Sequence, residues 1–126
     1  MPWQQVTLRL PAEAYSRAEA LLELLQYDHV WVKVSGADRV TRDGRFEDAI
    51  PVMQQLIAAA PDRCVWGTDW PHTGEREPIP EGVETVTVPY GEVDELKCLS
   101  VLADACPDAA TFQAILSDNP ARLYGF

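Results

Sequence analysis

An aspartate stands at the end of a short apolar run near the middle of the chain. Residues 64–68 are apolar without alternation, as in a strand buried on both faces of a parallel sheet, and Asp69 follows them directly. In parallel α/β barrels the catalytic side chains lie at this C-terminal end of a strand. A carboxylate there can accept a proton from water or bind a metal ion, so we predict that Asp69 is a catalytic residue.

A second run of the same kind lies earlier in the chain. Residues 30–34 alternate between valines and larger side chains, which predicts a strand, and the small pair Ser35-Gly36 ends it. Arg39 follows in the next turn. Its planar guanidinium can pair with both oxygens of a carboxylate, which favours an anionic ligand. The alternative is a surface arginine that pairs with Asp38 or Asp43, an interaction worth little.

Several side chains near these runs could instead have a purely structural role. Lys33 is expected to face a neighbouring helix or strand with its ammonium paired or reaching solvent, and an amine nucleophile is the alternative. His72, three residues after Asp69, either contributes to the site or is a solvent-facing loop imidazole. Asp69 itself would otherwise be a helix cap or a turn residue, because aspartate is common in both places.

Helical periodicity fills most of the remaining chain. Apolar residues recur at three- and four-residue spacing over 13–26, 46–60 and 93–105, and shorter helices are predicted over 107–116 and 121–124. The first ten residues alternate only weakly, in the manner of a strand. Residues 69–91 contain four prolines and predict a long loop, either functional or disordered, with a minor edge strand expected at 83–88.

The order of helices and strands indicates parallel βα units. Parallel strands need cover on both faces and neighbours on both edges, which two strands alone do not provide. The pattern therefore favours either a small open α/β domain or a piece of a larger parallel sheet.

Composition limits the kinds of partner and compartment. The net charge is -10 and the basic residues are scattered, so we expect no nucleic-acid partner. No apolar run approaches the roughly 20 residues that cross a bilayer, so no membrane association is expected, and the first residues do not resemble a signal peptide. The three cysteines form no CxxC pair, which favours buried thiols and a cytoplasmic location.

Three segments together resemble one family of hydrolases. They are VKVSGADR at 32–39, WGTDWPH at 66–72 and SDNPARLYGF at 117–126. Their order and spacing are similar to the C-terminal end of the amidohydrolase superfamily, in its amidohydrolase-related branch (family 2) of TIM-barrel hydrolases, and most of all to 2-pyrone-4,6-dicarboxylate lactonases. The resemblance covers residues 15–126, which we take as the C-terminal part of an amidohydrolase-related domain, whereas residues 1–14 form an unmatched N-terminal segment.

The resemblance implies a place in a barrel and a role for each candidate residue. Residues 30–34 would form the seventh strand of a (β/α)8 barrel and residues 64–68 the eighth. Asp69 would be the general base that activates water for attack on an ester carbonyl. Arg39 would bind a carboxylate of a small-molecule substrate, and His72 would line the same mouth of the barrel.

The resemblance also shows what this chain lacks. The family has a His-x-His pair on its first strand and another histidine near the end of the sixth, whereas this chain has only His29 and His72. A whole barrel also needs roughly 250 residues. We therefore expect an incomplete barrel of about the last two βα units. No cofactor is certain: a divalent, zinc-type metal would bind Asp69 only if the missing histidines were supplied.

These implications leave several functions open. The leading hypothesis is a hydrolase for a cyclic ester (lactone) or another carboxylated ring compound. The first alternative is a catalytically inactive fragment, because the histidines of the family are missing. The second is an assembly module, whose strand edges pair with a second copy or with a partner chain that supplies the rest of the barrel.

Overall fold

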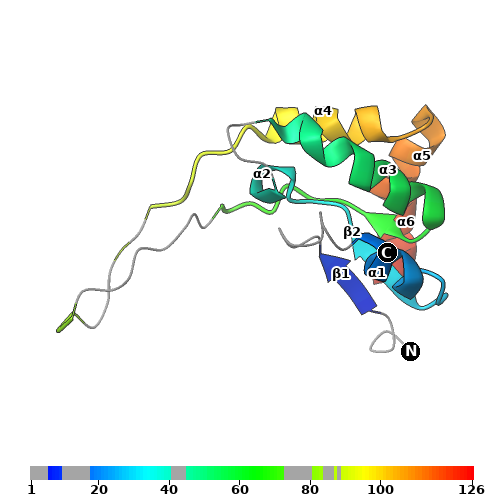
Figure 1. Ribbon diagram of the computed structural model, residues 1–126, viewed down its shortest axis with the longest axis horizontal. Coiled ribbons are helices and arrows are strands. Elements are labelled where there is room, and N and C mark those ends of the chain that lie inside the picture. The colour runs from blue at the N-terminus through cyan, green and yellow to red at the C-terminus, as the bar shows by residue number, and fades with distance from the viewer. Residues whose placement is uncertain (1–5, 10–17, 41–44, 73–80, 84–86, 88) are drawn as a thin grey trace.

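The computed structural model describes residues 6–9, 18–40, 45–72, 81–83, 87 and 89–126 (Figure 1). Helices alternate with short strands in this part of the chain, and none of its helices is long and apolar enough to cross a membrane. The elements in chain order are β1 (Val6–Arg9), α1 (Ala18–Leu24), β2 (Val30–Lys33), α2 (Ala37–Val40), the 3-10 helix η3 (Phe46–Ala49), α3 (Ile50–Ala59), β3 (Cys64–Val65), α4 (Glu95–Ala105), α5 (Ala109–Gln113), the π-helical turn η4 (Ala114–Asp118) and α6 (Asn119–Tyr124).

Within the described residues, three strands form one parallel sheet in the order β1-β2-β3. Val6 of β1 lies opposite Val30 of β2, and Val32 of β2 lies opposite Cys64 of β3. Parallel βα units are therefore confirmed. The weak alternation in the first ten residues corresponds to β1, which is a full strand of the sheet. The described sheet therefore has three strands, one more than the two on which the prediction was based. Its place depends on hydrogen bonds to β2, which the periodicity of a four-residue strand does not report.

β3 is shorter than the predicted run 64–68. The backbone N–H of Val34 donates to the carbonyl oxygen of Val65 at 2.9 Å, and β3 ends there. The N–H of Gly67 donates instead to the hydroxyl oxygen of Ser35, also at 2.9 Å. A side chain thus keeps the two segments together where the backbone ladder has stopped.

The segment that follows β2 begins with the short helix α2. The N–H of Arg39 donates to the carbonyl oxygen of Gly36 at 2.9 Å, and Gly36 has a φ of 85°, which glycine adopts without steric strain. Ala37 is buried against the core, and this contact holds the first turn of α2 on the sheet.

The longer helices agree with the predicted ranges apart from their ends. α3 carries a proline in its first turn, where the missing N–H is tolerated. Asp94 caps the first turn of α4, and α6 ends at Gly125, whose φ is 77°. The predicted helix 13–26 is described only in part, as α1, and the predicted edge strand 83–88 lies mostly outside the described residues.

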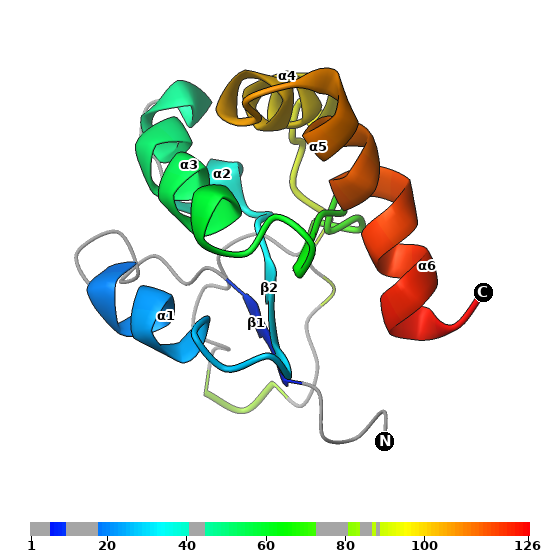
Figure 2. The same ribbon diagram turned by 90° about the vertical axis from the view of Figure 1, so that its right-hand side faces the viewer.

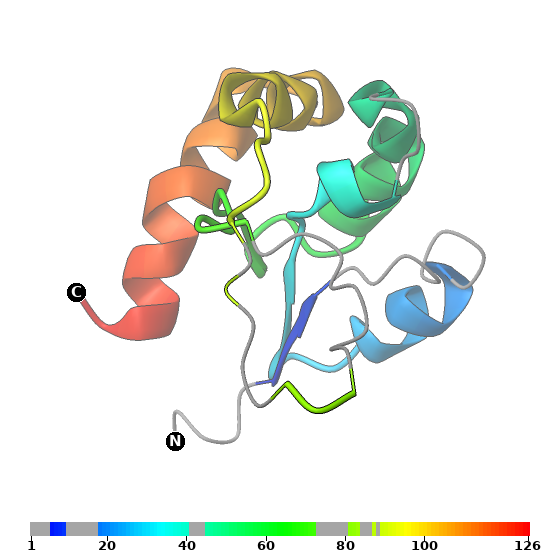
Figure 3. The same ribbon diagram turned by 90° about the vertical axis from the view of Figure 1, so that its left-hand side faces the viewer.

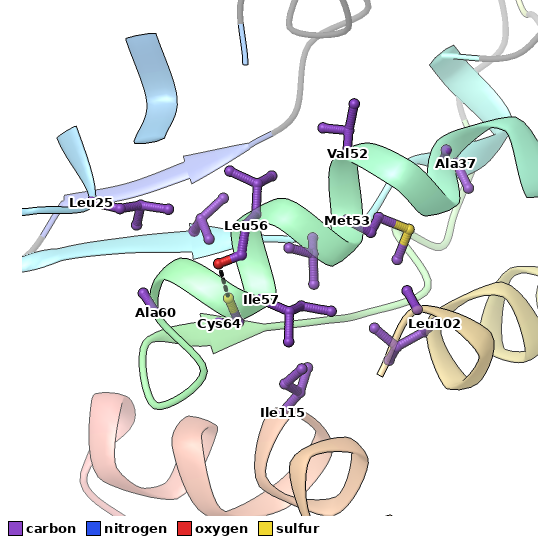
Figure 4. Close-up of a cluster of buried hydrophobic side chains, with 14 of the residues drawn as sticks. Leu25, Ala37, Val52, Met53, Leu56, Ile57, Ala60, Cys64, Leu102 and Ile115 are labelled. Atoms are coloured by element: carbon purple, nitrogen blue, oxygen red, sulfur yellow. Dashed lines mark hydrogen bonds between the residues drawn. The ribbon is translucent and has the colours of Figure 1, made fainter. Parts of the chain in front are cut away.

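The core lies between one face of the sheet and the helices, which form an arc around the strands (Figures 2 and 3). Val30, Val32 and Val34 supply the sheet side of the core. Figure 4 shows the cluster, in which α3 packs against α4. The predicted valine face of β2 and the predicted apolar stripe of α3 are thereby confirmed. The largest fully buried side chains include Leu25, Met53, Leu56, Ile57, Leu102 and Ile115.

The three cysteines belong to this core or its margin. Burial raises the pKa of the Cys64 thiol to about 12 and that of Cys98 to about 11, and it raises the pKa of Cys106 as well. The Sγ atom of Cys64 lies 3.7 Å from the carbonyl oxygen of Leu56 (Figure 4). At neutral pH all three therefore remain neutral thiols, which disfavours cysteine nucleophiles in this chain.

One polar side chain joins α6 to the base of β3. Asn119 is 1% exposed, and its Nδ2 donates to the carbonyl oxygens of Pro61 and Cys64, each at 2.8 Å. Its Oδ1 accepts a hydrogen bond from Arg122 at 3.3 Å. Because buried carbonyls are rarely left without a donor, this amide fixes the C-terminal helices against the strand.

Asn119→Ala removes both donors and should lower the free energy of unfolding by about 1–3 kcal/mol, because the buried carbonyl of Cys64 is left without its donor. Urea unfolding followed by circular dichroism measures the change. The matched control is Gln113→Ala on α5, where the side chain is exposed and the expected change is below about 0.5 kcal/mol. Equal stabilities of the two variants would contradict this role for Asn119.

Candidate active site

The C-terminal ends of β2 and β3 lie next to each other because the strands are parallel. Lys33, the last residue of β2, lies opposite Val65, and the hydrogen bond from Gly67 to Ser35 extends the contact beyond the ladder. Asp69 follows two residues later. A carboxylate thus stands beyond the end of a buried strand that has a parallel neighbour, as the sequence predicted.

The carboxylate of Asp69 forms an ion pair with Lys33. The ammonium Nζ of Lys33 donates to Oδ1 of Asp69, and the Asp69 side chain is 5% exposed while that of Lys33 is 30% exposed. Lys33 was expected to have a paired ammonium, but its partner was not identified from the sequence. The interpretation of Asp69 as a simple cap or turn residue does not account for this contact.

Two backbone features accompany the ion pair. A Cβ atom at Gly67 would lie 3.6 Å from Cε of Lys33, so the lysine stem runs across the glycine at van der Waals distance. Asp69 has a φ of 61°, in the left-handed region that aspartate enters more readily than most residues. Backbone held in such a region is often found at functional sites.

His72 is buried, 6% exposed, and pairs with the first turn of α4. Its Nε2 lies 3.2 Å from Oε1 of Glu95, while its carbonyl oxygen accepts a hydrogen bond from the N–H of Gly91 at 2.6 Å. The alternative interpretation of His72 as a solvent-facing loop imidazole is therefore wrong. Because a carboxylate only accepts, Nε2 is the donor, and Nδ1 has no hydrogen-bond partner within the described residues.

Glu95 was not among the candidate site residues identified from the sequence. The one signal that pointed to it was its place at the start of a predicted helix that follows the long proline-containing segment. Acidic residues are common in the first turn of any helix, so this position alone does not mark a functional group.

Arg39 lies on α2, which follows β2 closely, so it stands at the same end of the sheet as Asp69. Its side chain is exposed, and within the described residues it forms no ion pair with Asp38 or any other acid. Asp43, the other expected partner, lies outside that part of the chain. The guanidinium therefore faces solvent, where a ligand can reach it.

The described residues do not form a metal centre of their own. No group of three histidine, cysteine, aspartate or glutamate side chains gathers in this part of the chain. Oδ1 of Asp69 contacts the ammonium of Lys33, and Nε2 of His72 faces Glu95. Zinc sites use three or four protein ligands, so these residues by themselves do not fit the metal that the resemblance implies.

Curated relatives of the chain act on lactones and pyrones. It is 41% identical over 106 residues to the 4-sulfomuconolactone hydrolase of Rhizobium radiobacter, covering 83% of this chain and 32% of that protein. It is 29% identical over 108 residues to the 2-pyrone-4,6-dicarboxylate hydrolase of Comamonas testosteroni (79% and 31%), and 30% identical over 106 residues to the D-galactarolactone isomerase of Agrobacterium fabrum (83% and 32%). The chain spans about a third of the length of these relatives.

A solved structure and a family model also match the chain. The apo crystal structure of an Agrobacterium tumefaciens protein matches with a TM-score of 0.63 at 25% identity, over 86% of this chain and 34% of that chain. The family model described as Amidohydrolase matches residues 2–126. This match includes residues 2–14, which lie before the region that the three sequence motifs matched. The family and this neighbour indicate a fold of the TIM-barrel type. The chain belongs to the amidohydrolase family, and its relatives include lactone hydrolases.

Proposed function

We propose that the chain hydrolyses a cyclic ester (lactone) or another carboxylated ring compound, with Asp69 as the base that activates water. The observation that carries this proposal is the buried carboxylate of Asp69 at the C-terminal end of β3, paired with Lys33 of the parallel strand β2. Membership of a family whose relatives include lactone hydrolases supports the class of reaction.

The chemistry needs a carboxylate, a water molecule and an ester. The carboxylate of Asp69 takes one proton from water while the water oxygen bonds to the carbonyl carbon. The tetrahedral intermediate then collapses, the bond to the ring oxygen breaks, and that oxygen receives the proton from Asp69. The product is the open-chain hydroxy acid, and Asp69 is again ionised.

Arg39 and His72 are proposed to bind the substrate. The guanidinium of Arg39 is exposed at the same end of the sheet and has the geometry to hold a carboxylate through two hydrogen bonds. When the ring of His72 is neutral, the orientation imposed by Glu95 leaves a lone pair on Nδ1, and this buried atom would accept a hydrogen bond from a hydroxyl or water that enters beside it.

We further infer that the chain is the C-terminal part of a (β/α)8 barrel, with β2 and β3 as its seventh and eighth strands. In the described sheet, β1 and β3 each have one strand neighbour, so each presents an edge to further strands. A second copy or another chain would supply those strands. The histidines for a metal at Asp69 would have to come from a different chain, because a second copy carries only His29 and His72.

Asp69→Asn should lower the rate of lactone hydrolysis by at least about 100-fold, because a positioned general base contributes about 10²–10⁴ to the rate. The assay follows ring opening of 2-pyrone-4,6-dicarboxylate and of 4-sulfomuconolactone by the wild-type chain and the variant. Asp104→Asn, an exposed aspartate on α4, is the matched control and should keep the wild-type rate. Equal rates for wild type and Asp69→Asn, or no turnover by the wild type, would refute the catalytic assignment.

Arg39→Lys should raise KM about tenfold or more with kcat little changed, because a lysine cannot pair with both carboxylate oxygens at once. The measurement compares initial rates over a range of 2-pyrone-4,6-dicarboxylate concentrations. Arg45→Lys is the control, since Arg45 is also exposed but lies outside α2, directly before η3. An unchanged KM in Arg39→Lys would remove Arg39 from the site.

The strand edges also support the second candidate role, assembly with another copy. Size-exclusion chromatography with light scattering should then show a mass above 14.0 kDa that rises with protein concentration. A mass that stays at the monomer value up to high concentration would argue against an assembly module.

A further inference from the structure

Lys33 has hydrogen-bonding capacity beyond its contact with Asp69. An ammonium carries three N–H donors, and within the described residues its one partner is Oδ1 of Asp69. The Lys33 side chain is 30% exposed, whereas that of Asp69 is 5% exposed. The ammonium therefore lies between the buried carboxylate and the solvent, with donors left for a bound molecule.

The position of Lys33 on its strand keeps it out of the apolar core. Val32 and Val34 belong to the core cluster, and because side chains alternate along a strand, Lys33 lies on the opposite face of β2. There its stem crosses Gly67 and reaches the segment that follows β3. The lysine thus connects the ends of two strands on the face of the sheet turned away from the core.

Stability alone does not explain a lysine at this place. Buried ion pairs are often no more stabilising than apolar side chains of the same size. Lys97 on α4 provides the contrast: its Nζ lies 4.0 Å from Glu47, and both side chains are well exposed. That pair is an ordinary surface contact, whereas the Lys33 pair holds a buried carboxylate at a strand end.

We propose that Lys33 is a catalytic residue, whose ammonium donates a hydrogen bond to the carbonyl oxygen of the bound ester. This inference rests on the proposed hydrolysis with Asp69 as base. As the water oxygen bonds to the carbonyl carbon, the π electron pair of the carbonyl moves onto its oxygen, and Lys33 stabilises that negative charge. The pair returns to reform the carbonyl when the ring C–O bond breaks, so Lys33 keeps its proton throughout.

The contact between Lys33 and Asp69 makes this division of roles possible. A water molecule hydrogen-bonded to the carboxylate of Asp69 lies near the ammonium, because both contact the same group. An ester placed for attack has its carbonyl carbon about 3–3.5 Å from that water oxygen, which brings the carbonyl oxygen within reach of Nζ. Asp69 then acts on the attacking water while Lys33 acts on the carbonyl oxygen of the same tetrahedral centre.

Replacement of Lys33 should therefore lower kcat more than it affects substrate binding. In Lys33→Met, which keeps the length of the stem, kcat for 2-pyrone-4,6-dicarboxylate should fall about 100-fold or more while KM changes less than about threefold. Lys33→Arg should recover part of the loss because it restores the charge. Lys97→Met is the matched control with the same loss of charge, and it should keep wild-type kcat.

Binding of a tetrahedral analogue separates this role from simple positioning of Asp69. A six-membered cyclic phosphonate that carries a carboxylate imitates the charged intermediate, and calorimetry measures its affinity without turnover. If Lys33 contacts the oxyanion, Lys33→Met should bind the phosphonate about 30-fold or more weakly, with the product hydroxy acid bound as before. If Lys33 merely positions Asp69, the phosphonate binds both proteins equally, and the proposal is overturned.

The outcomes distinguish the two proposals. Loss of activity in Asp69→Asn with full activity in Lys33→Met would refute the role of Lys33 and leave the proposed function intact. No hydrolysis by the wild-type chain would refute both. Circular dichroism of each variant checks folding, and if Lys33→Met does not fold, Lys33→Arg decides by the same phosphonate affinity.

Discussion

The ion pair between Lys33 and Asp69 is the interaction on which the candidate site depends. It joins two side chains that are 36 positions apart in the chain. A carboxylate removed from water is destabilised by several kcal/mol unless an opposite charge and hydrogen bonds compensate. The ammonium of Lys33 supplies such an opposite charge to the buried Asp69 carboxylate. The pair therefore helps a charged carboxylate to remain buried at the strand ends, and the proposed general base must be ionised there.

The ion pair in turn depends on the packing of the sheet. The two residues meet because β2 and β3 run in the same direction with Lys33 opposite Val65, and because the hydroxyl of Ser35 holds Gly67 beside β2. That register is fixed on the other face, where Val32 and Cys64 are buried completely under α3 and the C-terminal helices. A one-residue slip would turn these side chains away from the helices and expose them. Core packing on one face thus sets the geometry of charged groups on the other.

The sequence predicted the parts of this arrangement that local patterns can report. Alternation marked the valine face of β2, helical spacing marked the stripe of α3, and the apolar run before Asp69 marked the end of a buried strand. It did not predict which residue Asp69 would meet, because periodicity says nothing about register between strands that are distant in the chain. The place of β1 in the sheet was missed for the same reason, and the contact between His72 and Glu95 was missed because it depends on how a loop packs against a helix that is distant in the chain. The chemical roles of Asp69, Arg39 and His72 remain predictions.

Because the chain has a negative net charge, the few basic side chains at this end of the sheet are especially important for binding an anion. The chain carries a net charge of -10, so at long range it repels the anionic ring compounds that the proposed function requires. At physiological salt, however, charges are screened beyond about 8 Å, and a ligand at the strand ends responds mainly to the groups nearest to it. There it meets the exposed side chain of Arg39 and the partly exposed side chain of Lys33. Recognition of an anion by this chain must therefore come from direct contact rather than from electrostatic steering. Added salt weakens the long-range repulsion and would therefore raise the rate of association. For a protein that attracts its substrate from a distance, added salt lowers this rate.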